Sequence, residues 1–485
     1  MRLKRLLLPA FLVVLTAGCG LGRGCSGSST PVPMKGVRLV DGVLLRPESE
    51  RFLDFFLIGL SRLDSDHFLL PKLKPQAGIA PDLLEQFRKD LYWLDFELSH
   101  GAIMRHIPPN TRIFVAVPGD ESAVERQIFS EYLEQRCGWT PEDIATRIFY
   151  FSTRTELIWA QDAGEILGRD EQDRAIIRVD ASGRAEYKES IQALVDAYPQ
   201  YFQLKETAVG VRAEGGDEEL VWLPDGQLAL LVGRNRVSEY LEAVHQDGHR
   251  TIAPDVPLIE DARQAFSRAF YDLPVVFVPQ SVLDNPALGS TDLFHIDMLV
   301  IIMSNGTQTH AFVPTFMENP VDAMTWKPLN PELVSACQRE YDLVAREMAG
   351  RGYTVIRLPY GDHPVRGPAN VVKYRDKETG EYVVMLGKYP YHYPPDQRNP
   401  QSILFNALAD FEDEGGSWQA APSPKTETQF RDRLGDVWKA LDEVAAAPNP
   451  IFDHQKELFE AAGYRVVGVP LYPWGSGGLH CQILR

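Results

Sequence analysis

The chain has 485 residues, of which 44% are hydrophobic, and its 67 Asp and Glu residues outnumber its 49 Lys and Arg residues. This length allows one large domain or two to three ordinary ones, and the apolar content is high enough to form buried cores. The net charge of −18 excludes nucleic-acid binding through the phosphate backbone, because that mode needs a surplus of cationic side chains. The same acidic balance favours cationic substrates.

The N-terminal residues, MRLKRLLLPAFLVVLTAGC, combine a basic start, a short apolar run and small residues before Cys19. This pattern predicts a secretory signal over residues 1–18, and the apolar run is too short to span a bilayer comfortably. The segment LTAGC resembles the bacterial lipobox, which implies that Cys19 is lipidated and becomes the new N-terminus. An ordinary signal peptide or a short membrane anchor is the alternative interpretation.

The next two segments connect this start to the body of the protein. Residues 19–36 are rich in Gly, Ser and Pro, which predicts a flexible tether. The exported protein would then contact the membrane through its lipid alone, at the outer membrane or the cell surface. Residues 37–105 contain short strand-like runs and a helical pattern near residues 81–100, and we interpret them as a small N-terminal extension.

Over residues 106–485 one pattern recurs: an amphipathic helix, a Gly turn and an apolar strand. Copies begin at Ser122, Pro331 and Phe452, and the last two share a Gly-Tyr pair before a β-branched strand. Repeated units of this kind indicate an internally repeated α/β architecture, with an ordinary doubly wound sheet as the alternative. Further apolar runs predict strands over residues 227–233, 273–279 and 295–303.

The five cysteines do not form a disulfide framework, because they are few and scattered in a long exported chain. Cys19 and Cys25 belong to the lipid and the tether. The other three are Cys137, Cys337 and Cys481, and no CxxC or zinc-type spacing occurs. Cys481, four residues from the end and directly after GSGGLH, is the candidate for a reactive thiol.

Four stretches combine acidic, imidazole and thiol groups in order: IWAQDAGEI, AEGGDEEL, FHIDMLV and GGLHC. Taken singly, each allows an ordinary structural role, such as a turn, a helix cap or a hydrogen-bonded core histidine. His295 and Asp297, however, stand two apart beside an apolar run, so on a strand they would project from one face. Burying a carboxylate and an imidazole together is costly unless they are paired or used, which favours a functional site.

An Asp, then a His-x-Asp, then a C-terminal Gly-rich turn ending in His-Cys resembles the guanidino-group-modifying superfamily of deiminases and amidinotransferases. The match runs from Trp159 to Cys481 and implies the five-fold pseudosymmetric α/β propeller called the pentein fold, here over residues 106–485. WAQDAGE looks most like the W-x-Q-D-x-x-E of the protein-arginine deiminase catalytic domain. EGGD is more typical of free-arginine deiminases, and related agmatine deiminases usually carry Arg where Gln161 stands.

The chemistry of these residue types suits hydrolysis of a guanidinium to a ureido group and ammonia. The carboxylates of Asp162 and Asp297 can bind opposite edges of the planar cation bidentately. The Cys481 thiolate attacks the central carbon to give a thiouronium intermediate. His295 protonates the departing ammonia and then activates water.

The resemblance implies further roles. Trp159 would pack on the aliphatic stem of the substrate, with a core tryptophan as the alternative, and Glu214 would orient His295. The reaction needs no cofactor. The residues that match a family calcium site are Gln161, Glu165 and Glu219, whose oxygen atoms suit Ca²⁺; solvated surface groups are the alternative.

The sequence departs from the protein-arginine deiminase pattern at two points. Ala163 stands where those enzymes place another calcium-linked acid, so the resemblance does not extend to a second, neighbouring calcium site. Their paired backbone-binding arginines have only a weak counterpart in Arg184, which leaves the substrate open between arginine residues in proteins and a small guanidine. Two other functions stay open: an amidinotransferase with the same Cys, His and Asp residues, and a non-catalytic guanidine-binding lipoprotein of the envelope.

Overall fold

The computed structural model describes most of the chain after the tether. The described residues are 38–60, 81–119, 122–155, 157, 160, 163–179, 185–208, 211–213, 215–245, 256–290, 292–293, 295–322, 327–389 and 424–471. The predicted signal, tether and lipidation site lie outside them. Within the described residues, no helix combines the length and the hydrophobicity needed to cross a bilayer.

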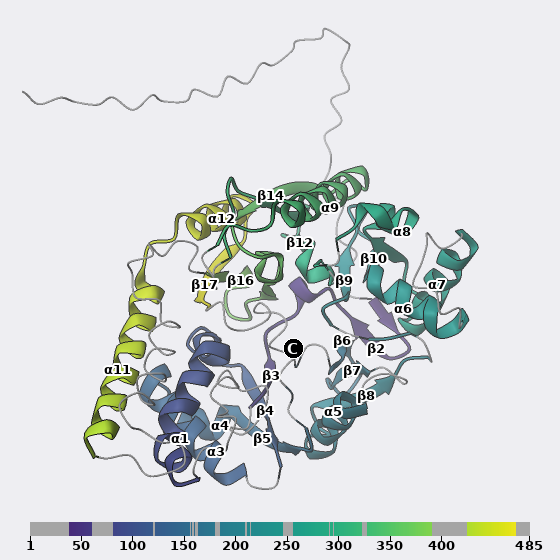
Figure 1. The fold of residues 1–485 in the computed structure, drawn as a ribbon. Coiled ribbons are helices and arrows are strands. Elements are labelled where there is room, and N and C mark those ends of the chain that lie inside the picture. The colour runs from purple at the N-terminus through teal and green to yellow at the C-terminus, as the bar shows by residue number, and fades with distance from the viewer. Residues whose placement is uncertain are drawn as a thin grey trace, which may run out of the picture.

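Five sheets lie around the middle of the molecule, and the helices lie outside them (Figure 1). In four sheets the first two strands are antiparallel, and a helical crossover leads to a third strand parallel to the second. The predicted α/β class is therefore confirmed. These sheets comprise β6 (Glu165–Arg169), β7 (Ala175–Val179), α5 (Ala185–Ala197) and β8 (Phe202–Glu206); β9 (Glu218–Trp222), β10 (Leu228–Gly233), α6 (Arg234–His245), α7 (Val256–Ala269) and β11 (Val275–Val278); β12 (Ile301–Ser304), β13 (Thr309–Phe316), α9 (Pro331–Gly350) and β14 (Thr354–Tyr360); and β15 (Val372–Arg375), β16 (Tyr382–Lys388), α11 (Pro424–Ala446), α12 (Pro450–Ala461) and β17 (Arg465–Pro470).

The remaining sheet is parallel throughout and contains β3 (Phe55–Gly59), β4 (Arg112–Pro118) and β5 (Ile148–Thr153). Its helices are α1 (Pro81–Phe96), the π-helix Glu97–Gly101, α2 (Ala102–Met104), α3 (Ser122–Cys137) and α4 (Pro141–Arg147). A hairpin of β1 (Arg38–Val40) and β2 (Val43–Leu45) pairs with β6. Strands of residues 37–105, predicted as an N-terminal extension, thus pair with strands of the predicted catalytic domain.

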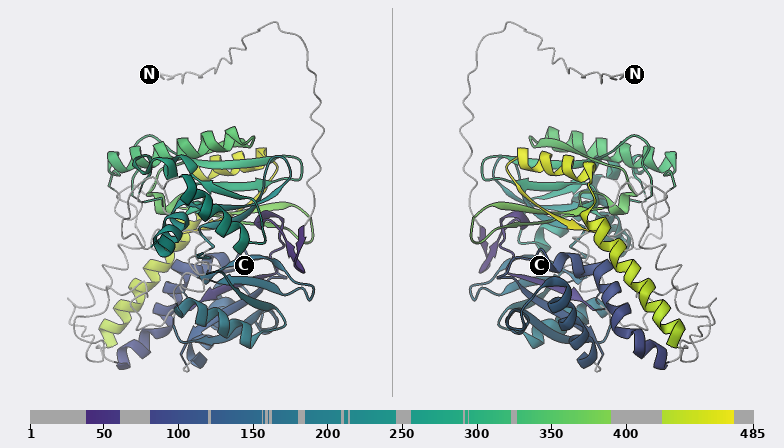
Figure 2. Two further views of the ribbon diagram at one scale, coloured as in Figure 1. Left: turned by 90° about the vertical axis from the view of Figure 1, so that its right-hand side faces the viewer. Right: turned by 90° about the vertical axis from the view of Figure 1, so that its left-hand side faces the viewer.

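The short elements are α8 (Gln280–Asp284) and the 3₁₀ helices Glu48–Glu50, Pro286–Leu288, Ile296–Met298 and Pro364–Arg366. The long helix α11 runs beside α1 on the flank of the molecule (Figure 2). An ion pair of 2.8 Å joins Arg431 of α11 to Asp90 of α1, and one of 3.0 Å joins Asp442 to Arg136 of α3. These contacts connect the crossover between β16 and β17 to the helices of the β3–β4–β5 sheet.

The predicted helix–Gly–strand units at α9–β14 and α12–β17 are confirmed, and their boundaries have a local cause. Asn330 caps α9 and Asn449 caps α12, each by accepting a backbone N–H of the first turn. Gly352 and Gly463 follow the helices with φ of 93° and 90°, a conformation that glycine adopts without strain. The tyrosine after each glycine is buried and lies directly before the strand that follows.

The strand prediction holds for residues 227–233 and 273–279, where β10 and β11 form with every residue buried. Their parallel pairing beneath α6 and α7 explains the continuous apolar runs, because both faces of the sheet are covered.

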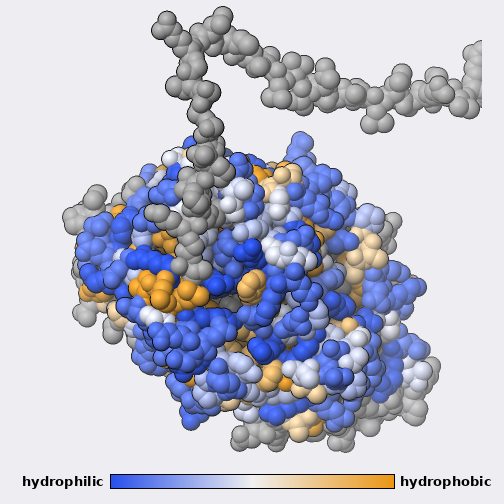
Figure 3. Space-filling model, turned by 180° about the vertical axis from the view of Figure 1, so that it is seen from behind, coloured by the Kyte–Doolittle hydropathy of each residue, from blue (hydrophilic) through white to orange (hydrophobic). Residues whose placement is uncertain are grey.

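In contrast, the face of the molecule opposite to Figure 1 is mostly hydrophilic, and apolar side chains appear there as separate patches (Figure 3).

Candidate active site

The candidate site forms where three segments of the chain meet. Each segment lies just before the first strand of its sheet, and the three sheets follow one another along the chain. Gly216 and Asp217 lie directly before β9, His295 and Asp297 lie before β12, and Asn370 lies two residues before β15. The Asp297 N–H donates to the Gly216 carbonyl oxygen at 3.2 Å, and the Asn370 amide donates to Oδ2 of Asp297 at 2.7 Å. These hydrogen bonds connect all three segments.

The turn before β9 packs directly against the imidazole of His295. A Cβ atom at Gly216 would lie 2.5 Å from Nδ1 of His295, so only glycine allows this close approach. The buried Asp217 carboxylate accepts the Ile296 N–H at 3.1 Å through Oδ1 and the Arg236 Nε–H at 2.8 Å through Oδ2. Asp217 therefore ties the segment that carries His295 to the first turn of α6.

The prediction that His295 and Asp297 share a strand is wrong. His295 precedes the 3₁₀ helix Ile296–Met298, which contains Asp297, and β12 begins only at Ile301. The backbone N–H groups here donate to the turn before β9 instead of to a neighbouring strand, so the two-residue strand period does not apply to the pair. Both side chains are nevertheless buried, as the sequence predicts.

A buried ion pair holds the loop that leads to His295. Arg234, the first residue of α6, lies 3.0 Å from Oε1 of Glu340 on α9 and donates to the carbonyl oxygens of Ser290 and Leu293. Oε2 of Glu340 accepts the Ser290 N–H at 2.6 Å. Burial raises the pKa of Glu340 to about 7, against the opposing effect of Arg234. A carboxyl that titrates near neutral pH thus supports the loop before His295.

A second charged group holds the loop before Asn370. Arg366 donates to both carboxylate oxygens of Asp362, at 2.8 and 3.0 Å, and to Asp322 at 3.1 Å. Bidentate pairing of this kind fixes the geometry as well as the charge. The Asn370 N–H donates to the Gly367 carbonyl oxygen at 3.4 Å. The residue whose side-chain amide binds Asp297 therefore belongs to a turn that hydrogen bonds and ion pairs hold in place.

The described members of the predicted calcium set face cationic side chains. Glu219 contacts the Nζ atom of Lys373, which also lies 3.0 Å from Glu48, and Glu165 lies 3.7 Å from Arg51. Burial would lower the pKa of Lys373, but the two carboxylates raise it above its ordinary value, so the ammonium stays charged. In the described part of the chain, no group of three or more His, Cys, Asp and Glu side chains is placed to hold a metal. This arrangement does not fit calcium at Glu219.

Neither described thiol is suited to nucleophilic attack. Burial raises the pKa of Cys137 to about 12 and that of Cys337 to about 11, so both stay protonated near neutral pH. The Sγ atom of Cys337 lies 3.2 Å from the Ser290 hydroxyl, in the support of the loop before His295. Cys481 is therefore still the candidate nucleophile.

The structure brings together His295, Asp297, Gly216 and Asp217, and it adds partners that the sequence patterns do not identify. The charge of Asp217, in the EGGD stretch, is a sequence signal that could have identified it as a site residue. Arg236 and Asn370 belong to no motif, so the sequence alone does not indicate that they contact the site. The predicted residues outside the described part of the chain are Cys19, Trp159, Gln161, Asp162, Arg184, Glu214 and Cys481. The roles assigned to them stay predictions.

No protein-family model matches the chain, and no curated protein matches it. Among solved structures, it is similar to the N-terminal domain of ArgZ, an arginine dihydrolase from the ornithine–ammonia cycle in cyanobacteria, as a cysteine-to-serine variant bound to substrate. The identity is 11% and the TM-score 0.31, over 89% of this chain and 97% of that one. It is also similar to AgrE in its ternary complex with ornithine and NAD⁺, with 13% identity and a TM-score of 0.34, over 89% of this chain and 39% of the AgrE chain.

Proposed function

We propose that the chain is a pentein enzyme that hydrolyses a guanidinium group to a ureido group and ammonia. The observation that carries the proposal is the burial of His295 and Asp297 beside Gly216 and Asp217, where three sheets bring their first strands together. Ionisable groups buried and fixed in this way, at a cost in folding free energy, are typical of functional sites. The strand pattern shared by four sheets supports the five-fold propeller.

Substrate binding is proposed to use two carboxylates. Asp297, whose Oδ2 accepts the Asn370 amide, would bind one edge of the planar guanidinium. Asp162, three residues before β6, would bind the other edge, and Trp159 would pack on the stem that carries the group. Both acids keep the cation charged, so its central carbon stays electrophilic.

The covalent steps use Cys481 and His295. The Cys481 thiolate forms a C–S bond to the central carbon, and the C–N bond to one nitrogen then breaks as His295 gives that nitrogen a proton, so ammonia leaves. His295 next takes a proton from water, and the hydroxide adds to the thiouronium carbon. The C–S bond breaks as the added hydroxyl group loses its proton to solvent, and the ureido product and the thiolate are released. No step requires a metal.

The substrate and the location complete the proposal. The substrate is an arginine residue in a protein or a small arginine-like molecule, and the acidic chain favours either cation over an anion. Lipidation at Cys19 would keep the enzyme in the bacterial envelope.

The test is citrulline formation by the chain from residue 20 onward, on a blocked peptidyl-arginine and on free arginine, each with calcium or with chelator. We expect citrulline from one of the two, unchanged by chelator, and none from Cys481→Ala. Cys137→Ala is the matched control, because it removes a thiol whose raised pKa keeps it protonated. Turnover that survives in Cys481→Ala would refute the assigned nucleophile, and no citrulline from either substrate would refute the proposed reaction.

A further inference from the structure

The first turn of α6 carries two arginines whose contacts reach the backbone on both sides of His295. Arg236 donates at 2.8 Å to Asp217, whose other carboxylate oxygen accepts the N–H of the residue after His295. Arg234 donates at 3.0 Å to the carbonyl oxygen of Leu293, two residues before His295. The position of the imidazole-bearing residue is therefore coupled to one turn of one helix from both directions along the chain.

The Arg234 guanidinium is enclosed between α9 and the loop that it contacts. It lies 3.0 Å from Oε1 of Glu340, whose side chain is fully buried, and it also donates to the carbonyl oxygen of Ser290. A Cβ atom at Gly289 would overlap Nη1 of Arg234, so the loop passes directly against the guanidinium. The planar fork of an arginine can satisfy several such acceptors in one fixed geometry.

Ser290 connects the loop to both helices. Its N–H donates to Oε2 of Glu340 at 2.6 Å, and its carbonyl oxygen accepts from Arg234. Its hydroxyl group lies 3.2 Å from Sγ of Cys337 and accepts the Asp292 N–H at 3.2 Å. Buried backbone polar groups need such partners, so the loop keeps its shape only while the ion pair between α6 and α9 stays in place.

These contacts separate Arg234 from the groups that the proposed function assigns to substrate binding. Arg234 holds the loop before His295, whereas the Asp297 side chain is held by Asn370. A catalytic group misplaced by about 1 Å can cost about 100-fold in rate. We propose that Arg234 is a positioning residue of the hydrolase: held by Glu340, it fixes the loop that places His295 for proton transfer. This inference rests on the proposed role of His295, and it gives Arg234 no contact with the substrate.

The test is Arg234→Lys in the chain from residue 20 onward. Lysine keeps the charge that balances Glu340, but its ammonium lacks the planar fork that reaches three acceptors here. Citrulline formation is measured at about pH 8, above the pKa of Glu340 of about 7, so that the carboxylate is charged. We expect kcat to fall about tenfold or more and KM to stay within about twofold, because the variant displaces a group that acts in the chemical steps.

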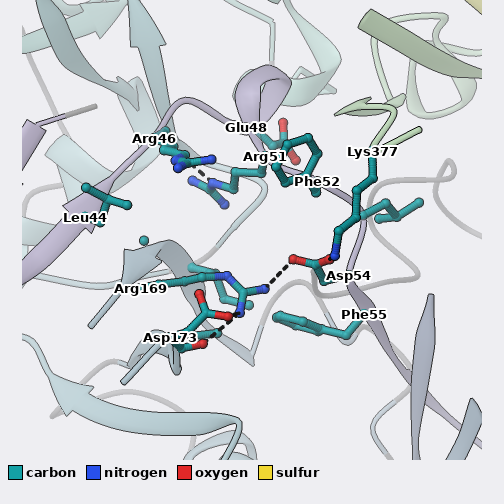
Figure 4. A pocket seen from close by; sticks show the side chains of 14 residues that line it. Leu44, Arg46, Glu48, Arg51, Phe52, Asp54, Phe55, Arg169, Asp173 and Lys377 are labelled. Carbon is teal, nitrogen blue, oxygen red and sulfur yellow. Dashed lines mark hydrogen bonds and ion pairs between the residues drawn. The ribbon is translucent and has the colours of Figure 1, made fainter. Parts of the chain in front are cut away.

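The matched control is Arg169→Lys. Arg169 also pairs with a carboxylate, that of Asp54 at 3.0 Å, and donates to a backbone carbonyl oxygen, that of Asp173 at 2.8 Å (Figure 4). It ends β6 and lines a pocket of about 250 Å³ beside the β6–β7 hairpin turn, whereas the candidate site lies where first strands begin. We expect kcat and the environment of His295 to be unchanged in this control.

A readout that does not need turnover is the imidazole NMR signal of His295, assigned by its loss in His295→Gln. This signal should shift in Arg234→Lys. Glu340→Gln keeps an oxygen for the Ser290 N–H but removes the charge that holds Arg234, so it should shift the signal in part. It also carries the test if Arg234→Lys does not fold.

The two readouts distinguish failure of this inference from failure of the proposed function. If even the unmodified chain forms no citrulline, the proposed reaction is refuted, and the His295 signal still decides whether Arg234 positions this residue. An unshifted signal in both variants, an unchanged kcat, a KM that rises alone, or an equal loss in Arg169→Lys would each overturn the proposal.

Discussion

The contact between Gly216 and His295 gives a sharp test of the site, because a single methyl group probes it. In Gly216→Ala the added Cβ would lie 2.5 Å from Nδ1 of His295, whereas ordinary van der Waals contacts begin at 3.4 Å. The imidazole must therefore move by about 1 Å, and a displacement of that size costs on the order of 100-fold in rate at a catalytic group. The φ of Gly216 is outside the left-handed region, so alanine meets no backbone strain there.

The effect should be much larger in the reaction than in folding. Forcing one methyl group into a packed contact typically costs about 1–3 kcal/mol of stability. We therefore expect kcat/KM for citrulline formation to fall roughly 100-fold, with a lowered thermal unfolding midpoint in a protein that still folds, and with the imidazole NMR signal of His295 shifted. Gly350→Ala is the matched control, because no atom lies within 4 Å of a Cβ at that glycine. A shifted His295 signal with full activity would refute the catalytic role of His295, and an unshifted signal would refute the placement.

Three further predictions concern the groups around this contact. Asn370→Ala should raise KM about tenfold or more, since a hydrogen bond to a charged group is worth roughly 1.5–3 kcal/mol, and an unchanged KM would remove Asp297 from substrate binding. Lys373→Met leaves Glu219 in the interior without its ammonium, so urea unfolding should show a loss of about 3–5 kcal/mol; adding Glu219→Gln should recover part of it, and full stability of the single variant would contradict the buried pair. The pKa of Glu340 is raised from 4.5 to about 7, so the folded protein holds a proton that the unfolded chain releases, and stability falls as pH rises through this range. At about 1.4 kcal/mol per pKa unit, the unmodified chain should lose roughly 3 kcal/mol more than Glu340→Gln between pH 4.5 and 8; parallel pH profiles of unfolding free energy would exclude this linkage.

The parts of the fold with local signals could be predicted from the sequence. A capping Asn, an amphipathic run and a glycine at positive φ define α9 and α12, and all these signals lie within one segment of chain. The apolar runs of β10 and β11 are equally local. Which strands pair, and that β3 of the predicted extension joins the sheet of β4 and β5, depends on long-range contacts and could not be read from the sequence.

The candidate site could be predicted only in part, for the same physical reason. His295 and Asp297 carry a signal because charged groups beside an apolar run must be buried at a cost. The strand placement failed because the hydrogen-bond partners of this segment, Gly216 and Asp217, come from another sheet. Asn370 has no local mark at all, since an asparagine in a loop before a strand is common, and only its 2.7 Å contact with Asp297 identifies it.

The repeat explains why residues so distant in the sequence act in one place. In four sheets the first strand is antiparallel to the second and the third is parallel to the second, so equivalent segments enter each sheet in the same way. The segments before β9, β12 and β15 meet in the candidate site, and Asp297 precedes its strand by four residues. Asp162 precedes β6, the first strand of the fourth such sheet, by three residues. The proposal that Asp162 binds the substrate thus rests on its position in the repeat as well as on its charge, and Glu165, already inside β6 and facing Arg51, does not have that position.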